Sequence, residues 1–219
     1  EQLLANGYGN IHSRALAEVH TRSLQYADLI NEALTLVPEL NTPFPETRLG
    51  RRLRIVARLL AVKDEFEVNR QIFYITTGGF DTHDTQNQDQ PDLLQDLGDC
   101  MQAFQTAMAE IGLENQVTSF TQSDFGRTLS SNGDGTDHGW GAHQLVAGGA
   151  VMGRQIYGTM PVLEIDGPDD VAGGRIIPTQ SADQYAATLA TWFGVPESAL
   201  NEIAPSLPAF NLRNLGFMT

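Results

Sequence analysis

The chain has 219 residues, of which 41% are hydrophobic, and a formal net charge of -14 at pH 7. This length and composition predict one domain with a single sizeable core. The acidity argues against a binder of nucleic-acid backbones, because such proteins normally present a basic face. No run of about 18 apolar residues occurs, so we expect no membrane span. The lone cysteine, Cys100, rules out an intrachain disulfide and a cysteine-based zinc site.

Two amphipathic helices are predicted in the first part of the chain. Apolar residues recur near helical spacing from Ser13 to about Leu36, and the same pattern returns over residues 46–67 with arginines on the other face. An Asn, Thr and Pro-rich loop at 41–45 separates them. His12 and His20 lie in the first segment, where a lone histidine is more often a surface or capping residue than a ligand.

A strand, a helix and a second strand are predicted next. Ile72–Thr76 is apolar on both faces, as in a strand buried inside a parallel sheet. A helical stripe over 92–111 ends at Gly112, and Val117–Thr121 gives the second strand. A βαβ unit of this kind has parallel strands. We therefore expect an α/β fold with a mostly parallel sheet flanked by helices.

The rest of the chain is expected to be less regular. A Gly, Asp and Asn-rich loop at 130–142 is followed by a strand near Gln144–Ala147 and a turn-rich stretch to Pro178. A helix with Ser181 as its N-cap comes next. We expect a single domain over 1–219, with an N-terminal helical region at 1–45, a core at 46–197 and an irregular apolar tail at 198–219.

Carboxylates and imidazoles gather where the predicted strands end. The candidates are Asp81, His83 and Asp84 in one loop, Asp124 in another, and Asp134, Asp137, His138 and His143 in a third. Ligands collect beyond the carboxyl ends of parallel strands, and mixed imidazole and carboxylate ligation suits a divalent metal. The alternative is that Asp and Asn beside Gly form ordinary turns and that His83 caps or packs.

Other common site signatures are absent or incomplete. Asn132, Asp134 and Thr136 resemble the start of a calcium loop, but Asp137 stands where glycine is required and His143 where glutamate is required. The chain has no G-x-S-x-G elbow, no P-loop and no dinucleotide fingerprint.

Four ordered motifs carry a family resemblance: GGFDTH at 78–83, SDFGRT at 123–128, GTDHGWG at 135–141 and QYAATLATWFGV at 184–195. With these motifs, residues 45–197 resemble the exported bacterial domain-of-unknown-function family 1501. That family is similar in fold to the alkaline phosphatase, sulfatase and phosphoglycerate mutase superfamily. The resemblance thus implies an alkaline-phosphatase-like fold and an exported protein, periplasmic, at the cell surface or extracellular.

The superfamily implies one or two divalent metal ions, with Zn, Mn, Mg and Ca not distinguished by the sequence. By this resemblance Asp81 and His83 are ligands, and Asp124 lies where the superfamily has an Asp-His pair, with Phe125 in place of the histidine. The remaining ligand candidates are Asp137, His138 and His143. Arg127 is expected either to clamp an oxyanion or to form a solvent-exposed salt bridge.

The resemblance also implies a nucleophile in an N-terminal half that this chain lacks. We therefore expect the C-terminal portion of a larger protein, completed by a missing N-terminal segment or a second subunit in a homo- or hetero-oligomer, or a member that has lost half its site. The leading hypothesis is a metal-dependent hydrolase of phosphate or sulfate esters. The alternative is a non-catalytic surface, assembly or binding protein that keeps the hydrolase-like fold.

Overall fold

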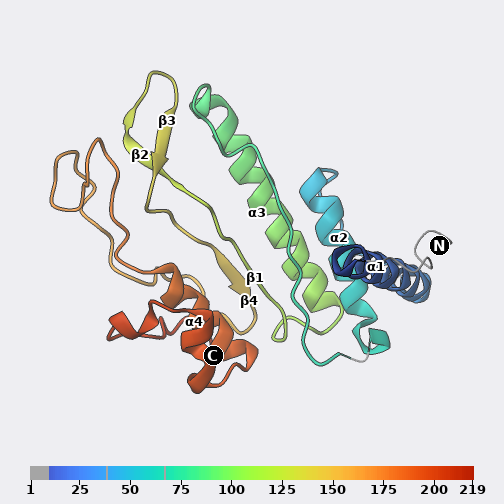
Figure 1. The fold of residues 1–219 in the computed structure, drawn as a ribbon. Coiled ribbons are helices and arrows are strands. Elements are labelled where there is room, and N and C mark those ends of the chain that lie inside the picture. Colours follow the sequence, from blue (N-terminus) through green and yellow to red (C-terminus); the bar gives the residue numbers. More distant parts are fainter. Residues whose placement is uncertain (1–9, 38, 67) are drawn as a thin grey trace.

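The computed structural model describes residues 10–37, 39–66 and 68–219. A helical part and a part built of small sheets, long loops and short helices lie on opposite sides of the long helix α3 (Gln86–Glu110) (Figure 1). Among the described residues no helix combines the length and the apolar character that a membrane crossing needs. This agrees with the expectation of no membrane span.

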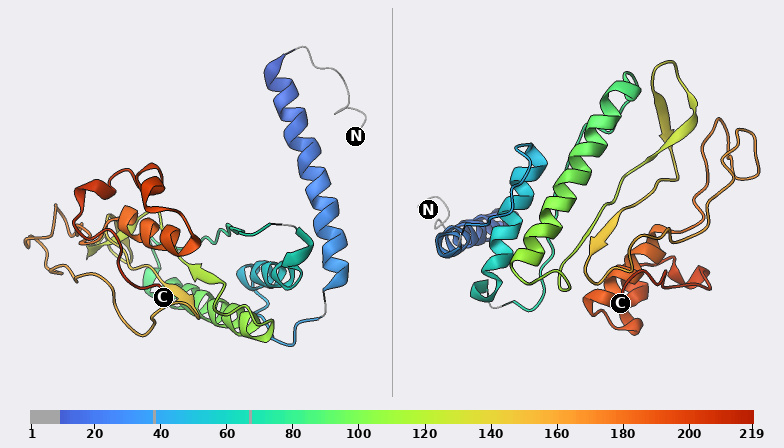
Figure 2. Two further views of the ribbon diagram at one scale, coloured as in Figure 1. Left: turned by 90° about the horizontal axis from the view of Figure 1, so that it is seen from below. Right: turned by 180° about the vertical axis from the view of Figure 1, so that it is seen from behind.

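The predicted N-terminal helices are confirmed as α1 (Ile11–Leu36) and α2 (Arg48–Ala61). Each begins at a polar N-cap: the Asn10 side chain accepts from the backbone N–H of Ser13, and the Thr47 side chain from that of Gly50. A short 3-10 helix, η1 (Lys63–Phe66), follows α2. α1 extends away from the rest of the molecule (Figure 2).

The main core lies between α2 and α3. Its buried residues are Val56, Ala57, Leu60, Phe104, Ala107, Met108 and Leu113. All but Leu113 recur at three- and four-residue spacing on two facing helices, which is why the periodicity predicted both. Cys100 is buried in α3, where desolvation raises the pKa of its thiol to about 11. The thiol is therefore a packing group.

The predicted mostly parallel sheet is wrong. The described residues form two small antiparallel pairs: β1 (Thr118–Phe120) with β4 (Val146–Gly148), and β2 (Gly126–Ser131) with β3 (Thr136–Gly139). The expected second strand at 117–121 exists as β1, but its partner is β4 and not the segment before α3. Because that ladder is antiparallel, no βαβ crossover is formed and the alkaline-phosphatase-like sheet is absent from these residues.

The expected first strand, Ile72–Thr76, is extended but belongs to no sheet among the described residues. Its apolar composition made it resemble a buried central strand. In the structure only Ile75 packs against the α2–α3 core, whereas Ile72 and Tyr74 are 78% and 89% exposed. A strand needs a ladder partner, and none of the described segments supplies one here.

The region 130–142, expected to be a loop, contains most of the β2–β3 hairpin. Gly126 pairs with Gly139 and Arg127 with His138, and a register irregularity precedes the Ser131–Thr136 pair. A Cβ on Gly126 would overlap the carbonyl of Gly141, so glycine is needed for this close approach. Within 130–142, Gly135 and Gly139 likewise lie against the backbone of His83 and Arg127, so these two glycines mark tight packing of a hairpin and not an open loop.

The C-terminal part is organised around α4 (Ala182–Phe193), with Ser181 as its N-cap as predicted. Ser181 and Gln184 form a capping box, and Gly194 ends the helix at φ 97°. The short helices η2 (Glu197–Ala199), α5 (Leu200–Ile203) and η3 (Leu207–Ala209) follow. Ala187, Leu200, Ala204 and Leu207 form a second core there.

Candidate metal centre

Two of the candidate ligands lie on the turn that leads into α3. Gly79, at φ 98°, bends the extended chain, and Asp81 and His83 follow within four residues. Thr85, the residue before α3, has φ 48°, which is an uncommon backbone conformation for a β-branched residue. Local strain of this kind is concentrated at functional sites in proteins.

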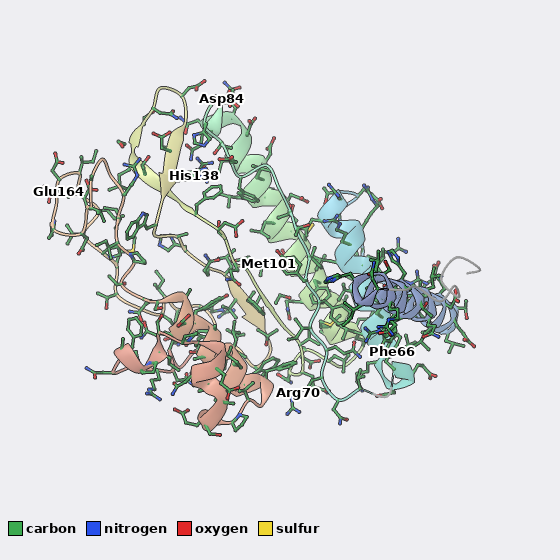
Figure 3. All side chains as sticks on the ribbon, viewed as in Figure 1. Phe66, Arg70, Asp84, Met101, His138 and Glu164 are labelled. Carbon is green, nitrogen blue, oxygen red and sulfur yellow. The ribbon has the colours of Figure 1, made fainter. Side chains whose placement is uncertain are left out.

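The β2–β3 hairpin brings a third candidate, His138, to the same place (Figure 3). The backbone N–H of Gln86 donates to the carbonyl of Asp134 at 3.1 Å, and the Thr136 hydroxyl donates to the Gln86 side chain at 2.8 Å. A Cβ on Gly135 would overlap the carbonyl group of His83. Backbone contact through this glycine therefore sets the distance between the hairpin and the turn.

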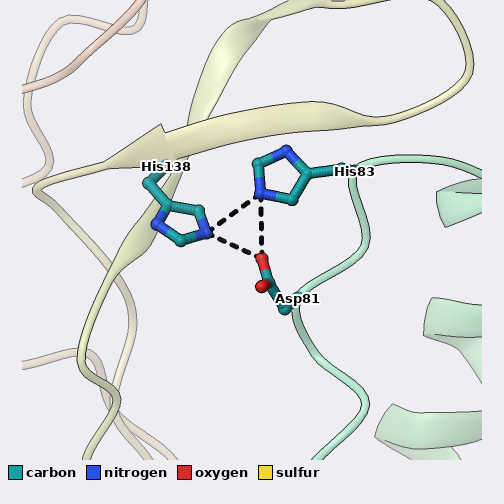
Figure 4. A group of neighbouring side chains, drawn as sticks. All are labelled: Asp81, His83 and His138. Carbon is teal, nitrogen blue, oxygen red and sulfur yellow. Dashed lines mark hydrogen bonds and ion pairs between the residues drawn. The ribbon is translucent and has the colours of Figure 1, made fainter.

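Asp81, His83 and His138 each direct one ligand atom to a common point (Figure 4). The two imidazole Nε2 atoms are 3.2 Å apart, and Asp81 Oδ1 lies 3.0 Å from that of His83 and 2.7 Å from that of His138. Ligand atoms around a tetrahedral zinc ion lie about 3.3 Å apart, and those around an octahedral ion with bonds of about 2.1 Å lie about 3.0 Å apart. The three distances of this triangle therefore lie near the edge of an octahedral face and are shorter than the edge of a tetrahedral zinc site.

Neighbouring side chains orient both imidazoles. Asp137 Oδ1 lies 3.4 Å from Nδ1 of His83, on the ring atom opposite the converging one. The Phe125 ring stacks on His138 with centroids 3.8 Å apart and planes 5° from parallel. A carboxylate near the far nitrogen of a histidine favours a proton on that nitrogen, which leaves the converging nitrogen free to bind an ion. The flat face of the Phe125 ring packs against the His138 ring and restricts its orientation.

Arg127 joins the two parts of the site. Its guanidinium donates to the carbonyl of Phe80 at 2.6 Å and to that of Thr136 at 2.8 Å, and lies 3.4 Å from Asp81 Oδ1. One planar group thus connects the residue before Asp81 with the strand that carries His138. The contacts give Arg127 a positioning role, and its role as an oxyanion clamp stays a prediction.

The charges around Asp81 favour its ionised form. The hydrogen bond with His138 is the largest cause that lowers the pKa of this carboxyl. Desolvation, the next largest, opposes it, and the charges of His138, His83 and Arg127 lower the pKa further. A carboxyl must be deprotonated to bind a metal ion. The site therefore keeps Asp81 ready for ligation.

The remaining candidates lie outside the triangle. Asp137 contacts it only through His83, and Asp84, Asp124, Asp134 and His143 are exposed. Among the side chains that the structure describes, Asp124 and His143 make no polar contact with the three converging residues. Both stay predictions as metal ligands.

Sequence reasoning did not identify two contributors to the geometry. Phe125 stands in the sequence where a histidine is expected, and in the structure its ring stacks on His138. Gly135 belongs to the predicted loop, and in the structure it lies against the backbone of His83. A glycine between Asp134 and the strand of His138 indicates a close backbone approach, but only the tertiary structure shows that the approaching backbone is that of His83.

The fold thus combines helices with antiparallel strand pairs, and it carries an exposed site of one carboxylate and two imidazoles. A family model described as "Protein of unknown function (DUF1501)" matches residues 31–173, and the chain belongs to this family. This confirms the family predicted from the four motifs, whereas the wider superfamily placement stays a prediction. Comparisons with curated proteins and with solved structures gave no match.

Proposed function

We propose that Asp81, His83 and His138 hold a divalent cation and that the protein hydrolyses phosphate or sulfate esters with it. The observation that carries the proposal is the convergence of one carboxylate oxygen and two imidazole nitrogens, from segments distant in the sequence, within 4.8 Å of one another. Mixed ligation of this type suits Zn, Mn or Fe(II). Three protein ligands leave coordination positions for a substrate oxygen and water.

The chain's own residues support this chemistry in distinct ways. Asp81 supplies the negative charge that attracts a cation. The Asp137 carboxylate lies beside Nδ1 of His83, and the Phe125 ring stacks on the imidazole of His138. Arg127 holds the two ligand-bearing segments together through their carbonyls. A bound divalent cation supplies Lewis acidity toward the ester oxygens and activates water. The resemblance of the four motifs further supports an exported protein in which another polypeptide segment or subunit completes the site.

A non-catalytic binding or assembly role is the second candidate, favoured by the exposure of the cluster. The side chains of Asp81, His83 and His138 are 60%, 47% and 46% exposed. Catalytic sites exclude water to strengthen electrostatic interactions, and this one is open to solvent in the described structure. A site of this kind suits a structural ion or a partner contact unless another segment covers it.

Metal binding tests the site directly. The protein is equilibrated with Zn²⁺ or Mn²⁺, its metal content is measured by mass spectrometry, and its affinity by titration calorimetry. Asp81→Asn and His138→Ala are each expected to lower affinity by about 100-fold or more, since even residues outside the ligand set change it 10–100-fold. His20→Ala, on α1 and outside the candidate ligand set, should leave it unchanged. Stoichiometric binding that Asp81→Asn and His138→Ala leave intact would remove the proposed site.

Turnover separates the two candidate functions. The protein as isolated from its source is assayed on aryl phosphates and aryl sulfates, before and after treatment with a chelator. Hydrolysis that the chelator and Asp81→Asn both abolish supports the hydrolase. Bound metal without turnover on either ester class supports the binding or assembly role.

A further inference from the structure

The extended segment Ile72–Thr76 has the features of a strand without its sheet. None of its backbone N–H groups donates a hydrogen bond to another described residue. Its carbonyls are almost as free: Thr76 accepts from Arg52, and no other carbonyl of the segment has a described partner. An exposed row of unpaired backbone N–H and C=O groups is a template for pairing with another strand.

The side chains of the segment are unusual for a surface loop. Ile72 and Tyr74 are 78% and 89% exposed, and Phe73 is also exposed, whereas Ile75 packs on the α2–α3 core. Exposed apolar residues that stand singly need no explanation, but three in succession beside unpaired backbone form a docking surface.

The segment lies beside two arginines of α2, Arg48 and Arg52. Arg48 and Leu49 line a hollow of about 470 Å³ together with Thr76, Thr77 and Gly78. Neither Arg48 nor Arg52 is ion-paired with a carboxylate among the described residues. In a chain of net charge -14, two adjacent arginines without acidic partners are a local exception. Charge complementarity therefore calls for carboxylates opposite α2.

A second copy paired about a two-fold axis does not meet that requirement. Such a pairing would place the same patch, with the same two arginines, on both sides of the interface. Like charges facing each other at an interface are unfavourable. The charge pattern favours a different segment with negative side chains.

We propose that Ile72–Thr76 accepts a β-strand from a partner segment that is extended, apolar toward the α2–α3 core and acidic toward α2. The incoming backbone pairs with the free N–H and C=O groups, and its Asp or Glu side chains face Arg48 and the hollow beside Thr76 and Thr77. This is strand addition, in which backbone hydrogen bonds supply affinity and flanking side chains supply specificity. The proposal does not depend on the hydrolase function.

A photo-reactive amino acid at position 74 tests the surface in the protein assembled in its own cells. The cross-linked peptide is sequenced, and amide hydrogen exchange of 72–76 is measured in the same material and in the isolated chain. We expect one cross-linked segment that contains Asp or Glu, together with amides protected in the assembly and unprotected in the isolated chain. The same photo-reactive residue in place of the exposed Tyr26 on α1 is the control and should not capture that segment.

A charge reversal tests the acidic character of the partner. Arg48→Glu should lower the cross-linking yield at position 74 by about fivefold or more, since it replaces an attraction with a repulsion. Arg22→Glu, on the exposed surface of α1, should leave it unchanged. A cross-link to a second copy of the chain, a partner segment without carboxylates, or amides equally unprotected in both samples would each overturn the proposal.

Discussion

The α2–α3 layer and the metal-ligand loops are held together by different interactions. Between the helices, buried side chains such as Phe104 and Met108 pack in one continuous cluster. In the loops, the parts meet through backbone carbonyls, glycines and the guanidinium of Arg127. Apolar packing tolerates changes of similar volume, whereas a backbone contact at a glycine tolerates no added atom. Stability and ligand geometry should therefore respond to different substitutions.

Phe104→Ala should have the largest effect on stability, because it removes a buried ring from the α2–α3 core. The expected loss is about 3–5 kcal/mol of unfolding free energy, measured by urea denaturation followed by circular dichroism. Gln102→Ala, on an exposed position of the same helix, is the control. If the two regions are independent, the folded Phe104→Ala protein keeps its metal affinity. A loss of metal affinity in this variant would show that the helical core and the ligand loops are coupled.

Gly135→Ala should act mainly on the site. The added Cβ meets the carbonyl group of His83, so the hairpin and the turn must separate and the ligand triangle must widen. We expect a loss of metal affinity of about 10–100-fold by calorimetry, comparable to the loss of an orienting contact. Gly98→Ala is the matched control, because nothing lies within 4 Å of its Cβ. In helix α3 it should stabilise the protein by about 0.5–1 kcal/mol.

Arg127→Lys should have a smaller effect on the same site. An ammonium keeps the charge but not the planar pair of donors that reaches Phe80 and Thr136 together. One carbonyl then loses its partner, at a cost of about 1–3 kcal/mol, and amide exchange in the hairpin should rise. Arg22→Lys on α1 controls for the substitution itself. Unchanged exchange and unchanged metal affinity would show that Arg127 does not hold the loops.

Glu110→Gln should have the smallest effect, and one that depends on pH. The Thr42 hydroxyl and the backbone N–H of Asn41 are the main causes that lower the pKa of the Glu110 carboxyl from 4.5 to about 2. Because the folded pKa is depressed, the stabilisation is fully present above pH 4.5 and is lost as pH falls toward 2. The difference in melting temperature from Glu110→Gln should shrink over that range, with the exposed Glu202→Gln as control. A difference that does not vary with pH would contradict the ionised hydrogen-bonded carboxylate.

Part of the fold was predictable because its causes are local. The helices α1 to α4 follow apolar spacing and capping residues such as Thr47 and Ser181, which act within a few positions along the chain. The strand at 118–120 was also predicted, but its partner was not. Strand pairing depends on which distant segment is available, and neither apolar run carried that information.

The sequence by itself determined the family, the helices and the short list of carboxylates and imidazoles from which a site could be made. Only the tertiary structure selected Asp81, His83 and His138 from that list, placed Asp137 and Phe125 behind the imidazoles, and left Ile72–Thr76 unpaired. Helix formation and motif identity are set by neighbouring residues, whereas convergence at a point depends on backbone contacts between segments far apart in the chain, such as that of Gly135 with His83.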